Sequence, residues 1–419
     1  MSDNKDIFVY AGWLNNELIG IIHRGIVSGG EVVSFEYDNN WLGSHSNLML
    51  DPTIPQTPYR TYSEDKKLFG AFEDSCPDRW GRKLIERREA KYAAKEKRRP
   101  KKFFETDYLL AVQDCFRSGG FRYKTDPYGD FLDNDENYSI PPITAIRELE
   151  QISLGYEKDT DEKWLKQLVN PGSSLGGARP KANVADIDGS LWIAKFPSKN
   201  DDYDIGAWEK TANDLALMCG LNVPETKLMN ISELGSTFLT KRFDRKYENS
   251  KEFRIHYTSA MTMLGARDGE TDGLGYLDLT EVICNIASEV DKDLHELFNR
   301  MVFNIAISNH DDHLRNHGFI LNGTRWELSP VFDINPVAGE EFLSMNIDID
   351  NGYRSFDKAL DTCEFYHLSK DEAKKCVNNI AGTITISWEH TASKNGIKKS
   401  EQKYMASAFE LAKEYYLGL

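Results

Sequence analysis

The sequence predicts an α+β protein in three successive parts: a strand-containing N-terminal part, a small α+β part and a helical C-terminal part. Apolar and polar residues alternate, with interrupting glycines, near the N-terminus and again between residues 181 and 245. Beyond residue 279 the apolar residues recur mostly at helical spacing. At 419 residues, the chain is also too long for one domain of average size. We place the parts at residues 1–105, 106–245 and 246–419.

The N-terminal part should begin with three short strands. Residues 7–10, 18–22 and 32–37 alternate in polarity, and turn residues separate them at Asn15-Asn16 and Gly29-Gly30. A helical pattern then extends from about residue 68 to residue 97. Its end is rich in lysine and arginine, for which we favour a solvated helix face or an exposed loop over a nucleic-acid contact.

The middle part is expected to alternate helices and strands. Residues 142–170 have a helical pattern, and a glycine-rich loop follows at residues 170–181. A strand–turn–strand unit comes next, with its turn at Asp188-Gly189. A helix over residues 207–221 ends at a glycine, and two strands lie within residues 223–245.

The last part is expected to be mostly helical, with one compact interruption at residues 308–337. This interruption is dense in polar side chains but has apolar flanks, and it contains strand-like residues at 318–321 and 325–328. Polar groups packed between apolar elements must be satisfied, so they usually form a network or a ligand site. We expect a ligand site between the middle and last parts, because ligands often bind in clefts between lobes.

Charge and cysteine usage narrow the class of protein further. Lys and Arg number 51 and Asp and Glu 67, so the net charge of −16 makes a general nucleic-acid binder a poor expectation. The six cysteines include no C-x-x-C pair and are expected to be reduced thiols. A polar start and the lack of a long apolar stretch predict a soluble, cytoplasmic protein with no membrane segment.

The polar run at residues 308–317 has the spacing of a phosphoryl-transfer site. Asp311 and Asn316 stand five residues apart, as do the proton-accepting aspartate and metal-binding asparagine of a kinase catalytic loop. Arg315 lies between them and could neutralise phosphate charge. Asp333 follows Phe332, and we place it at the end of a short strand as a second metal ligand. These oxygen ligands, together with phosphates, suit Mg²⁺.

Further candidates lie upstream of this run. The glycine-rich loop can bring backbone N–H groups against phosphate, but it is not a Walker A loop because Ala178 stands where that motif has lysine. Lys195, at the end of a predicted strand, is similar to the strand lysine that pairs with phosphates in kinases. Glu209, on the following helix, is its possible ion-pair partner. The order of these features supports the interpretation more than any single residue does.

Simpler roles remain open for each residue. Asp311 or Asp312 could cap a helix or a turn, and Asp333 could be a buried salt-bridge partner. Lys195 could be a solvated lysine of an edge strand, and Glu209 a surface residue of its helix.

Two other kinds of site are weaker alternatives. His310, His313 and His317 could hold zinc, but no cysteine is near, and we favour a hydrogen-bonded His313. Residues 172–176 match the Gly-x-Ser-x-Gly elbow of hydrolases. That motif needs an apolar strand before it and a helix after it, and the sequence predicts neither here.

Five segments together resemble one known family. They are residues 174–181, 193–197, 241–245, 309–317 and 328–333. In this order they resemble HipA, the serine/threonine kinase toxin of type II toxin–antitoxin modules. The strand-rich start and residues 72–81 resemble the N-terminal subdomain of that family, so the resemblance covers nearly the whole chain. It implies a protein-kinase-like two-lobed fold with a β-containing N-terminal subdomain and a helical C-terminal lobe.

The resemblance also implies roles for individual residues. Asp311 would be the catalytic base, assisted by Lys195 and Arg315, and Asn316 and Asp333 would bind Mg²⁺. The strand end at residues 241–243 would receive the adenine of ATP through backbone groups, and Asp244 would lie near the ribose. The residues implied to bind ATP are Gly176, Gly177, Ala178, Arg179, Pro180, Lys181, Lys195, Lys241, Arg242, Phe243, Asp244, His313, Asn316 and Asp333.

Regulation and partners follow from the resemblance as well. Ser174, with Ser173 as the alternative, would be autophosphorylated, and the added charge would expel the loop from bound phosphates. The partners would be a small DNA-binding antitoxin similar to HipB and a protein substrate of translation such as an aminoacyl-tRNA synthetase. DNA would be contacted only through the antitoxin, and a homodimer could form within that complex. The rival functions are a small-molecule kinase and a non-catalytic nucleotide-binding regulator.

Overall fold

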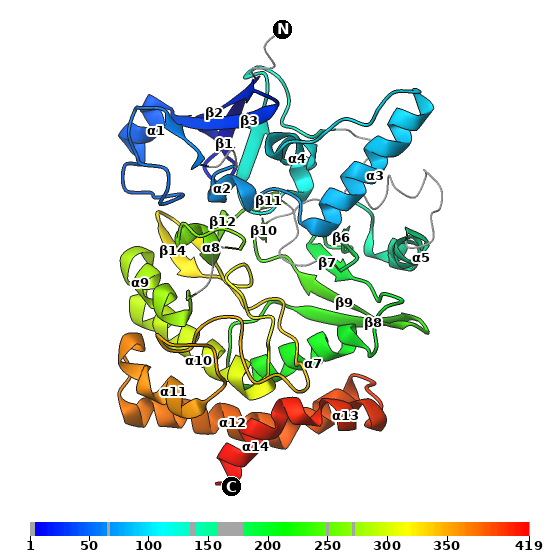
Figure 1. Cartoon of the computed structure of the whole chain (residues 1–419), viewed down its shortest axis with the longest axis vertical. Helices are drawn as coiled ribbons and strands as arrows, with labels where there is room; N and C mark the ends of the chain where they lie inside the picture. Colours follow the sequence, from blue (N-terminus) through cyan, green and yellow to red (C-terminus); the bar gives the residue numbers. More distant parts are fainter. Residues whose placement is uncertain are drawn as a thin grey trace. The chain divides into compact units, whose positions relative to one another are not determined.

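The computed structural model describes residues 5–64, 68–134, 140–156, 179–248, 251–269 and 273–418. The chain forms two compact units (Figure 1). The first unit comprises Met1–Ala194, Arg242–Gly265 and Ile320–Thr324, and the second comprises Lys195–Lys241, Ala266–Phe319 and Arg325–Leu419. Because the chain passes between the units several times, this division differs from the boundaries expected at residues 105 and 245.

The first unit contains a five-stranded sheet in the order β4-β3-β2-β1-β5. The strands β1 (Lys5–Ala11), β2 (Glu17–Val27) and β3 (Gly30–Tyr37) are antiparallel neighbours, and this confirms the three predicted strands. Val27 pairs with Gly30, so Ser28 and Gly29 form a two-residue turn in which both φ angles are positive. The other two strands are β4 (Thr61–Tyr62) and β5 (Phe121–Lys124).

Helices and shorter strands complete the first unit. The helices are α1 (Asn39–Ser44), α2 (Gly70–Glu73), α3 (Arg79–Lys95), α4 (Glu105–Ala111), α5 (Ile146–Tyr156) and α8 (Ala260–Met263). The strands are β6 (Lys181–Ala185), β7 (Leu191–Lys195, whose last residue begins the second unit), β10 (Arg245–Glu248), β11 (Lys251–Arg254) and β12 (Tyr257–Ser259). The predicted helix at residues 68–97 is therefore two helices, with Pro77 in the break between them.

The segment that contains Pro77 connects several elements of the first unit. The Oδ1 atom of Asp78 caps α3 by accepting from the backbone N–H of Gly81, and its Oδ2 atom accepts from Lys181 Nζ at 2.8 Å. Trp80 donates from its indole N–H to the carbonyl of Lys181. Lys181 was expected in the phosphate loop, but it is the first residue of β6 and its side chain is only 2% exposed. Its ammonium group neutralises Asp78.

The second unit is mainly helical, as the sequence predicted. Its helices are α7 (Ile205–Met218), α9 (Tyr276–Ile286), α10 (Val290–Ile307), α11 (Phe356–Asp361), α12 (Lys370–Lys394), α13 (Lys399–Met405) and α14 (Glu410–Leu417). Its hairpin joins β8 (Thr226–Ser232) and β9 (Gly235–Lys241), which pair antiparallel. The strands β13 (Gly318–Asn322) and β14 (Arg325–Leu328) follow the polar run, and β13 belongs to the first unit from Ile320 onward.

Apolar side chains hold the helices of the second unit together. α10 buries Leu294, Leu297, Met301 and Ile305, which recur every three to four residues. α12 packs against α7, α10 and α14. The polar run therefore begins at the C-terminal end of a helix, α10, that is held in place by packing. Within the described residues, no helix combines the length and the apolar character that crossing a membrane requires.

Candidate active site

The polar loop, residues 308–317, begins where α10 ends. Ser308 takes a left-handed conformation with a φ of 57°, and its backbone N–H donates to the carbonyl of Asn304. A left-handed residue at the C-terminus of a helix reverses the chain direction, although glycine is the usual residue there. The loop then turns back and continues into β13 at Gly318.

Asp311 and Asn316 are joined within this loop. Asn316 donates from Nδ2 to the backbone carbonyl of Asp311 at 2.8 Å. The side chain of Asp311 is 77% exposed, whereas Asn316 is buried. The Oδ1 atom of Asn316 is buried and has no hydrogen-bond partner within the described part of the chain. A buried carbonyl oxygen is costly to leave unpaired, so this atom is suited to bind a ligand such as a cation.

The surroundings of Asp311 raise the pKa of its carboxyl group. Loss of hydration is the largest cause and the negative charge of Asp333 adds to it, whereas His313 acts in the opposite direction. His313 Nε2 lies 3.8 Å from Asp311 Oδ1, which is too long for a hydrogen bond. A carboxylate with a raised pKa is a stronger base, and a solvent-exposed one can reach a substrate.

Lys195 lies between two carboxylates in the second unit. Its Nζ atom is 2.5 Å from Glu209 Oε1 and 2.5 Å from Asp333 Oδ1. Lys195 and Glu209 are both buried, which excludes the alternatives of a solvated edge lysine and a surface helix residue. Burial alone would lower the pKa of Lys195, but the charges of Asp333 and Glu209 outweigh it and raise that pKa.

The element that carries Glu209 is held tightly against β9. Asp204 caps α7 by accepting from the backbone N–H of Ala207, and it also accepts from the backbone N–H of Ser236. A Cβ atom on Gly206 would lie 2.2 Å from the carbonyl oxygen of Ser236, so glycine allows this close approach. Glu209 therefore projects toward Lys195 from a helix whose first turn is pinned.

Asp333 is placed differently from the sequence prediction. We expected it at the end of a strand, but β14 ends at Leu328 and Asp333 lies in an irregular segment. Its φ of 57° is in the left-handed region, which costs energy for a residue with a Cβ atom. Strained residues of this kind cluster at functional sites, where the surrounding structure holds them.

The three histidines of the loop have separate surroundings. His310 donates from Nδ1 to the carbonyl of Phe342, and His317 Nε2 lies 2.7 Å from Asp312 Oδ1. His313 Nδ1 is buried without a hydrogen-bond partner in the described residues, which therefore do not supply the hydrogen bond expected at this atom. Nor does any group of three His, Cys, Asp or Glu in the described ranges have the arrangement of a metal site. The zinc alternative thus has no support there.

Arg315 is held by an acidic partner on the preceding loop. Its Nε and Nη2 atoms donate to the two carboxylate oxygens of Asp268 at 2.9 and 3.1 Å. The two-pronged geometry fixes the plane of the guanidinium group. The Arg315 side chain is 30% exposed, so it reaches the surface of the loop only in part.

At the strand end predicted to receive adenine, two backbone N–H groups already make hydrogen bonds within the protein. The backbone N–H groups of Lys241 and Arg242 donate to Glu225 and Leu191. Any adenine contact through these two residues must use other backbone groups. Lys241 is the last residue of β9, and so it does lie at a strand end.

The Asp244 carboxylate has a structural role that the sequence did not indicate. It accepts from the buried guanidinium groups of Arg242 and Arg245 and from the backbone N–H of Gly119. Burial alone would raise the pKa of Asp244, but these two arginines lower it well below its usual range. Its oxygens are therefore engaged in an internal ion pair of the first unit, and the implied position near the ribose stays a prediction.

Part of the predicted site lies outside the described residues. These positions are Ser173, Ser174, Gly176, Gly177 and Ala178, together with the Gly-x-Ser-x-Gly match at residues 172–176. Arg179 and Pro180 lead directly into β6.

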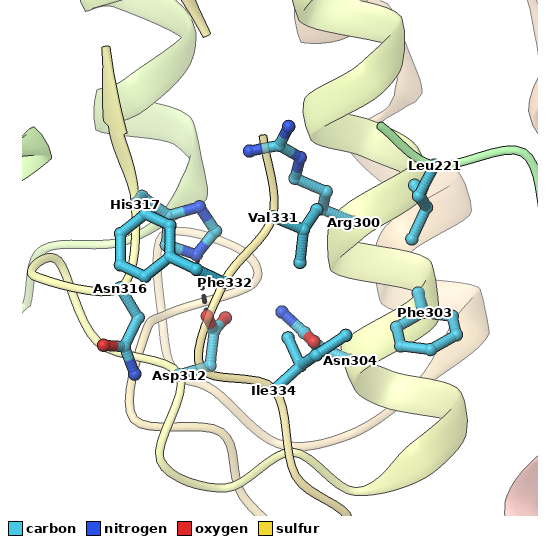
Figure 2. A pocket seen from close by; sticks show the side chains of 10 residues that line it. All are labelled: Leu221, Arg300, Phe303, Asn304, Asp312, Asn316, His317, Val331, Phe332 and Ile334. Atoms are coloured by element: carbon cyan, nitrogen blue, oxygen red, sulfur yellow. Dashed lines mark hydrogen bonds and ion pairs between the residues drawn. The ribbon is translucent and has the colours of Figure 1, made fainter. Parts of the chain in front are cut away.

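A buried polar network beneath the loop was missed at the sequence level. Asp312 was considered only as a cap, but it is 2% exposed and accepts from Tyr276 and His317. Figure 2 shows Asp312 and His317 in contact beside Asn304, Asn316 and Phe332, around a small pocket with room for about one water molecule. The one sequence signal was that Asp312 and His317 repeat the five-residue spacing of Asp311 and Asn316.

Together, the buried lysine–glutamate pair, the Asp311–Asn316 loop and Asp333 have the residue types and the chain order that a kinase site uses. Residues 173–388 match the HipA-like C-terminal domain, and residues 11–100 match the HipA N-terminal domain. The chain therefore belongs to the HipA family.

Two known proteins illustrate this similarity. A chain from the Shewanella oneidensis MR-1 toxin–antitoxin complex of HipA, HipB and operator DNA shares the fold, with a TM-score of 0.70 and 18% identity. The match covers 99% of this chain and 98% of that chain. The putative kinase Y4dM of Sinorhizobium fredii (strain NBRC 101917 / NGR234) is 28% identical over 179 residues, which are 39% of this chain and 42% of that protein. The matched region thus spans less than half of that relative.

Proposed function

We propose that the chain is an ATP- and Mg²⁺-dependent serine/threonine protein kinase of the HipA type. The observation that carries this proposal is the buried Lys195 ammonium, which pairs with both Glu209 and Asp333 in the unit that also contains Asp311 and Asn316. A solvated lysine or an isolated cap would not need two carboxylate partners. Phosphoryl transfer needs this set to position phosphates, metal and base.

Asp311 would accept the proton of the attacking hydroxyl group. Its carboxylate is exposed, so an acceptor side chain can reach it, and its raised pKa favours proton acceptance. Lys195 would place a fixed positive charge beside the ATP phosphates, and Arg315 would add a second at the loop surface. Adenine would bind through backbone groups near residues 241–243, and His313 and residues 176–180 would complete the nucleotide site.

Asn316 and Asp333 would hold the metal ion. The unpaired, buried Oδ1 atom of Asn316 and the carboxylate of Asp333 are hard oxygen donors, which fit Mg²⁺. When bound, the ion would neutralise charge on the transferring phosphoryl group. Asp333 is already oriented by its ion pair with Lys195.

The proposal extends to a toxin that controls its own activity. Autophosphorylation of Ser174, or of Ser173, would add negative charge beside the ATP phosphates and so expel the loop. A HipB-like antitoxin would bind the chain and carry the DNA contact, and a protein of translation would be the substrate. Membership of the HipA family supports these assignments, and so does the fold shared with a chain of a HipA–HipB–DNA complex.

The test is incubation of the purified full chain with labelled ATP and Mg²⁺, followed by mass spectrometry of the modified peptides. Phosphate should appear on Ser174 or Ser173. The Asp311→Ala variant should lower incorporation by about 100-fold or more while ATP binding persists. Asp333→Ala should weaken binding of ATP in the presence of Mg²⁺.

A matched control tests whether the loss is specific to the site. Asp291 is 74% exposed and lies in the same unit, on the first turn of α10. Asp291→Ala should therefore retain wild-type incorporation. Full activity of Asp311→Ala would refute the assignment of the base. Transfer only to a metabolite would favour the small-molecule kinase, and absence of both binding and transfer would favour the non-catalytic regulator.

A further inference from the structure

Asp312 is a buried carboxylate that pairs with no lysine or arginine among the described residues. It is 2% exposed, and its partners are the hydroxyl of Tyr276 and the Nε2 atom of His317. Burying a carboxylate is costly unless strong hydrogen bonds stabilise it. The contacts of Asp312 therefore constrain the loop, because any movement would leave a buried charge poorly paired.

The contact between the side chains of Asp312 and His317 bridges the polar loop next to the Asp311–Asn316 pair. Asp312 directly follows Asp311 in the sequence, and His317 directly follows Asn316. The 2.8 Å hydrogen bond from Asn316 to the Asp311 carbonyl closes the loop a second time. These two closures set the separation between the base and the asparagine.

The network continues from Asp312 to the segment that carries Asp333. The backbone N–H of Asn335 donates to Asn309 Oδ1, and Asn309 Nδ2 donates to Asn304 Oδ1. Asn304 Nδ2 donates in turn to the hydroxyl oxygen of Tyr276 at 2.9 Å.

In this series of hydrogen bonds, every donor points along the path from Asn335 toward Asp312. The Tyr276 hydroxyl is the last donor, and its proton is directed at the Asp312 carboxylate. Hydrogen bonds aligned in this way polarise one another, and the terminal negative charge strengthens the series. Tyr276 on α9 and Asn304 on α10 thereby tie both parts of the site to the helical core.

We propose that Tyr276 and Asp312 are positioning residues that set the relative placement of Asp311, Asn316 and Asp333. Neither needs to touch substrate, because they act through the loop and through Asn335. This inference rests on the proposed function. The sequence spacing of Asp311, Asn316 and Asp333 does not predict this supporting network.

The decisive variant is Tyr276→Phe, which removes only one hydroxyl group. We expect kcat for phosphate incorporation to fall about 10- to 100-fold, as is typical when a partner behind a metal ligand is lost. The Mg²⁺ concentration for half-maximal rate should rise by a similar factor, because Asn316 would lose its fixed orientation. The KM for ATP measured at saturating Mg²⁺ should change by less than about threefold. Asp312→Asn should act in the same direction.

Tyr366→Phe is the matched control. Tyr366 is a fully buried tyrosine of the same unit whose hydroxyl contacts Met301 Sδ, outside the network. It should retain the wild-type kcat and Mg²⁺ dependence even if its melting temperature drops. His317→Gln, which keeps a donor near the Nε2 position, should retain more activity than His317→Ala.

The outcomes separate the two proposals. An active wild type with the expected Mg²⁺ shift in Tyr276→Phe supports the positioning role. An active wild type for which Tyr276→Phe and Tyr366→Phe behave alike overturns the positioning role and leaves the kinase proposal standing. A wild type that binds no Mg²⁺–ATP and transfers no phosphate overturns both.

Discussion

Among single residues, Lys195 has the most demanding environment in the candidate site. Its ammonium group is buried and pairs with two carboxylates, those of Glu209 and Asp333. Replacing a buried ion pair as a whole is often tolerated, whereas removing one member leaves an uncompensated buried charge. Lys195 is therefore important for folding as well as for any binding of phosphates.

The Lys195→Met variant should lose both activity and stability. The free energy of unfolding of the full chain should fall by about 3 to 5 kcal/mol, because the buried Glu209 loses its ion pair with Lys195. Adding Glu209→Gln should recover part of that stability but none of the phosphate incorporation. Urea denaturation and the incorporation assay measure the two effects.

A surface ion pair provides the control for this effect. Lys292 pairs with Glu289 and is 62% exposed, so Lys292→Met should cost less than about 1 kcal/mol. A similarly small loss in Lys195→Met would contradict the charge compensation that we assign to it.

At the scale of elements, the start of α3 and the start of β6 depend on one side chain. Asp78 caps the helix with one carboxylate oxygen and neutralises the buried Lys181 with the other. The cap and the ion pair are separable, because asparagine keeps an oxygen for the helix but loses the charge. Two elements far apart in sequence are thus joined through a residue of the segment at 72–81.

Asp78→Ala should therefore be more harmful than Asp78→Asn. Both variants remove the ion pair between Asp78 and the buried Lys181, at a cost of about 3 to 5 kcal/mol. Alanine should add about 1 kcal/mol for the lost cap. Asp38 caps α1 without a lysine partner, and so Asp38→Ala should cost only the cap energy. Equal stabilities for Asp78→Ala and Asp38→Ala by urea denaturation would refute the ion-pair contribution.

For the whole molecule, sequence patterns predicted the local features and missed the contacts between distant segments. The spacing of Asp311 and Asn316 is local, and the order of Lys195, Glu209 and Asp333 follows known kinase parts. The pairing of β1 with β5, in which Phe8 lies opposite Lys124, joins strands more than 100 residues apart, and no local period contains it. No sequence pattern predicts the contact from Tyr276 to Asp312, for the same reason. A hydroxyl partner from another helix leaves no pattern within the loop.

The pH dependence of stability is also a property of the whole chain, and His256 makes a defined contribution to it. His256 is buried in the first unit, stacked on Trp13 at 4.4 Å, and burial lowers its pKa to about 3. The unfolded chain binds a proton at this residue below about pH 6.5, but the folded chain does not. The stabilising contribution is therefore complete above about pH 6.5 and is lost as the pH falls toward about 3.

His256 should account for a loss of about 1.4 kcal/mol of unfolding free energy between about pH 7.5 and about pH 5.5. The His256→Gln variant cannot titrate, so the difference in unfolding free energy between wild type and variant should shrink by that amount over the same interval. Urea denaturation at the two pH values measures it. A wild-type-like pH dependence in His256→Gln would show that the buried ring is not the group responsible, and the loss would then have to come from a different titrating group.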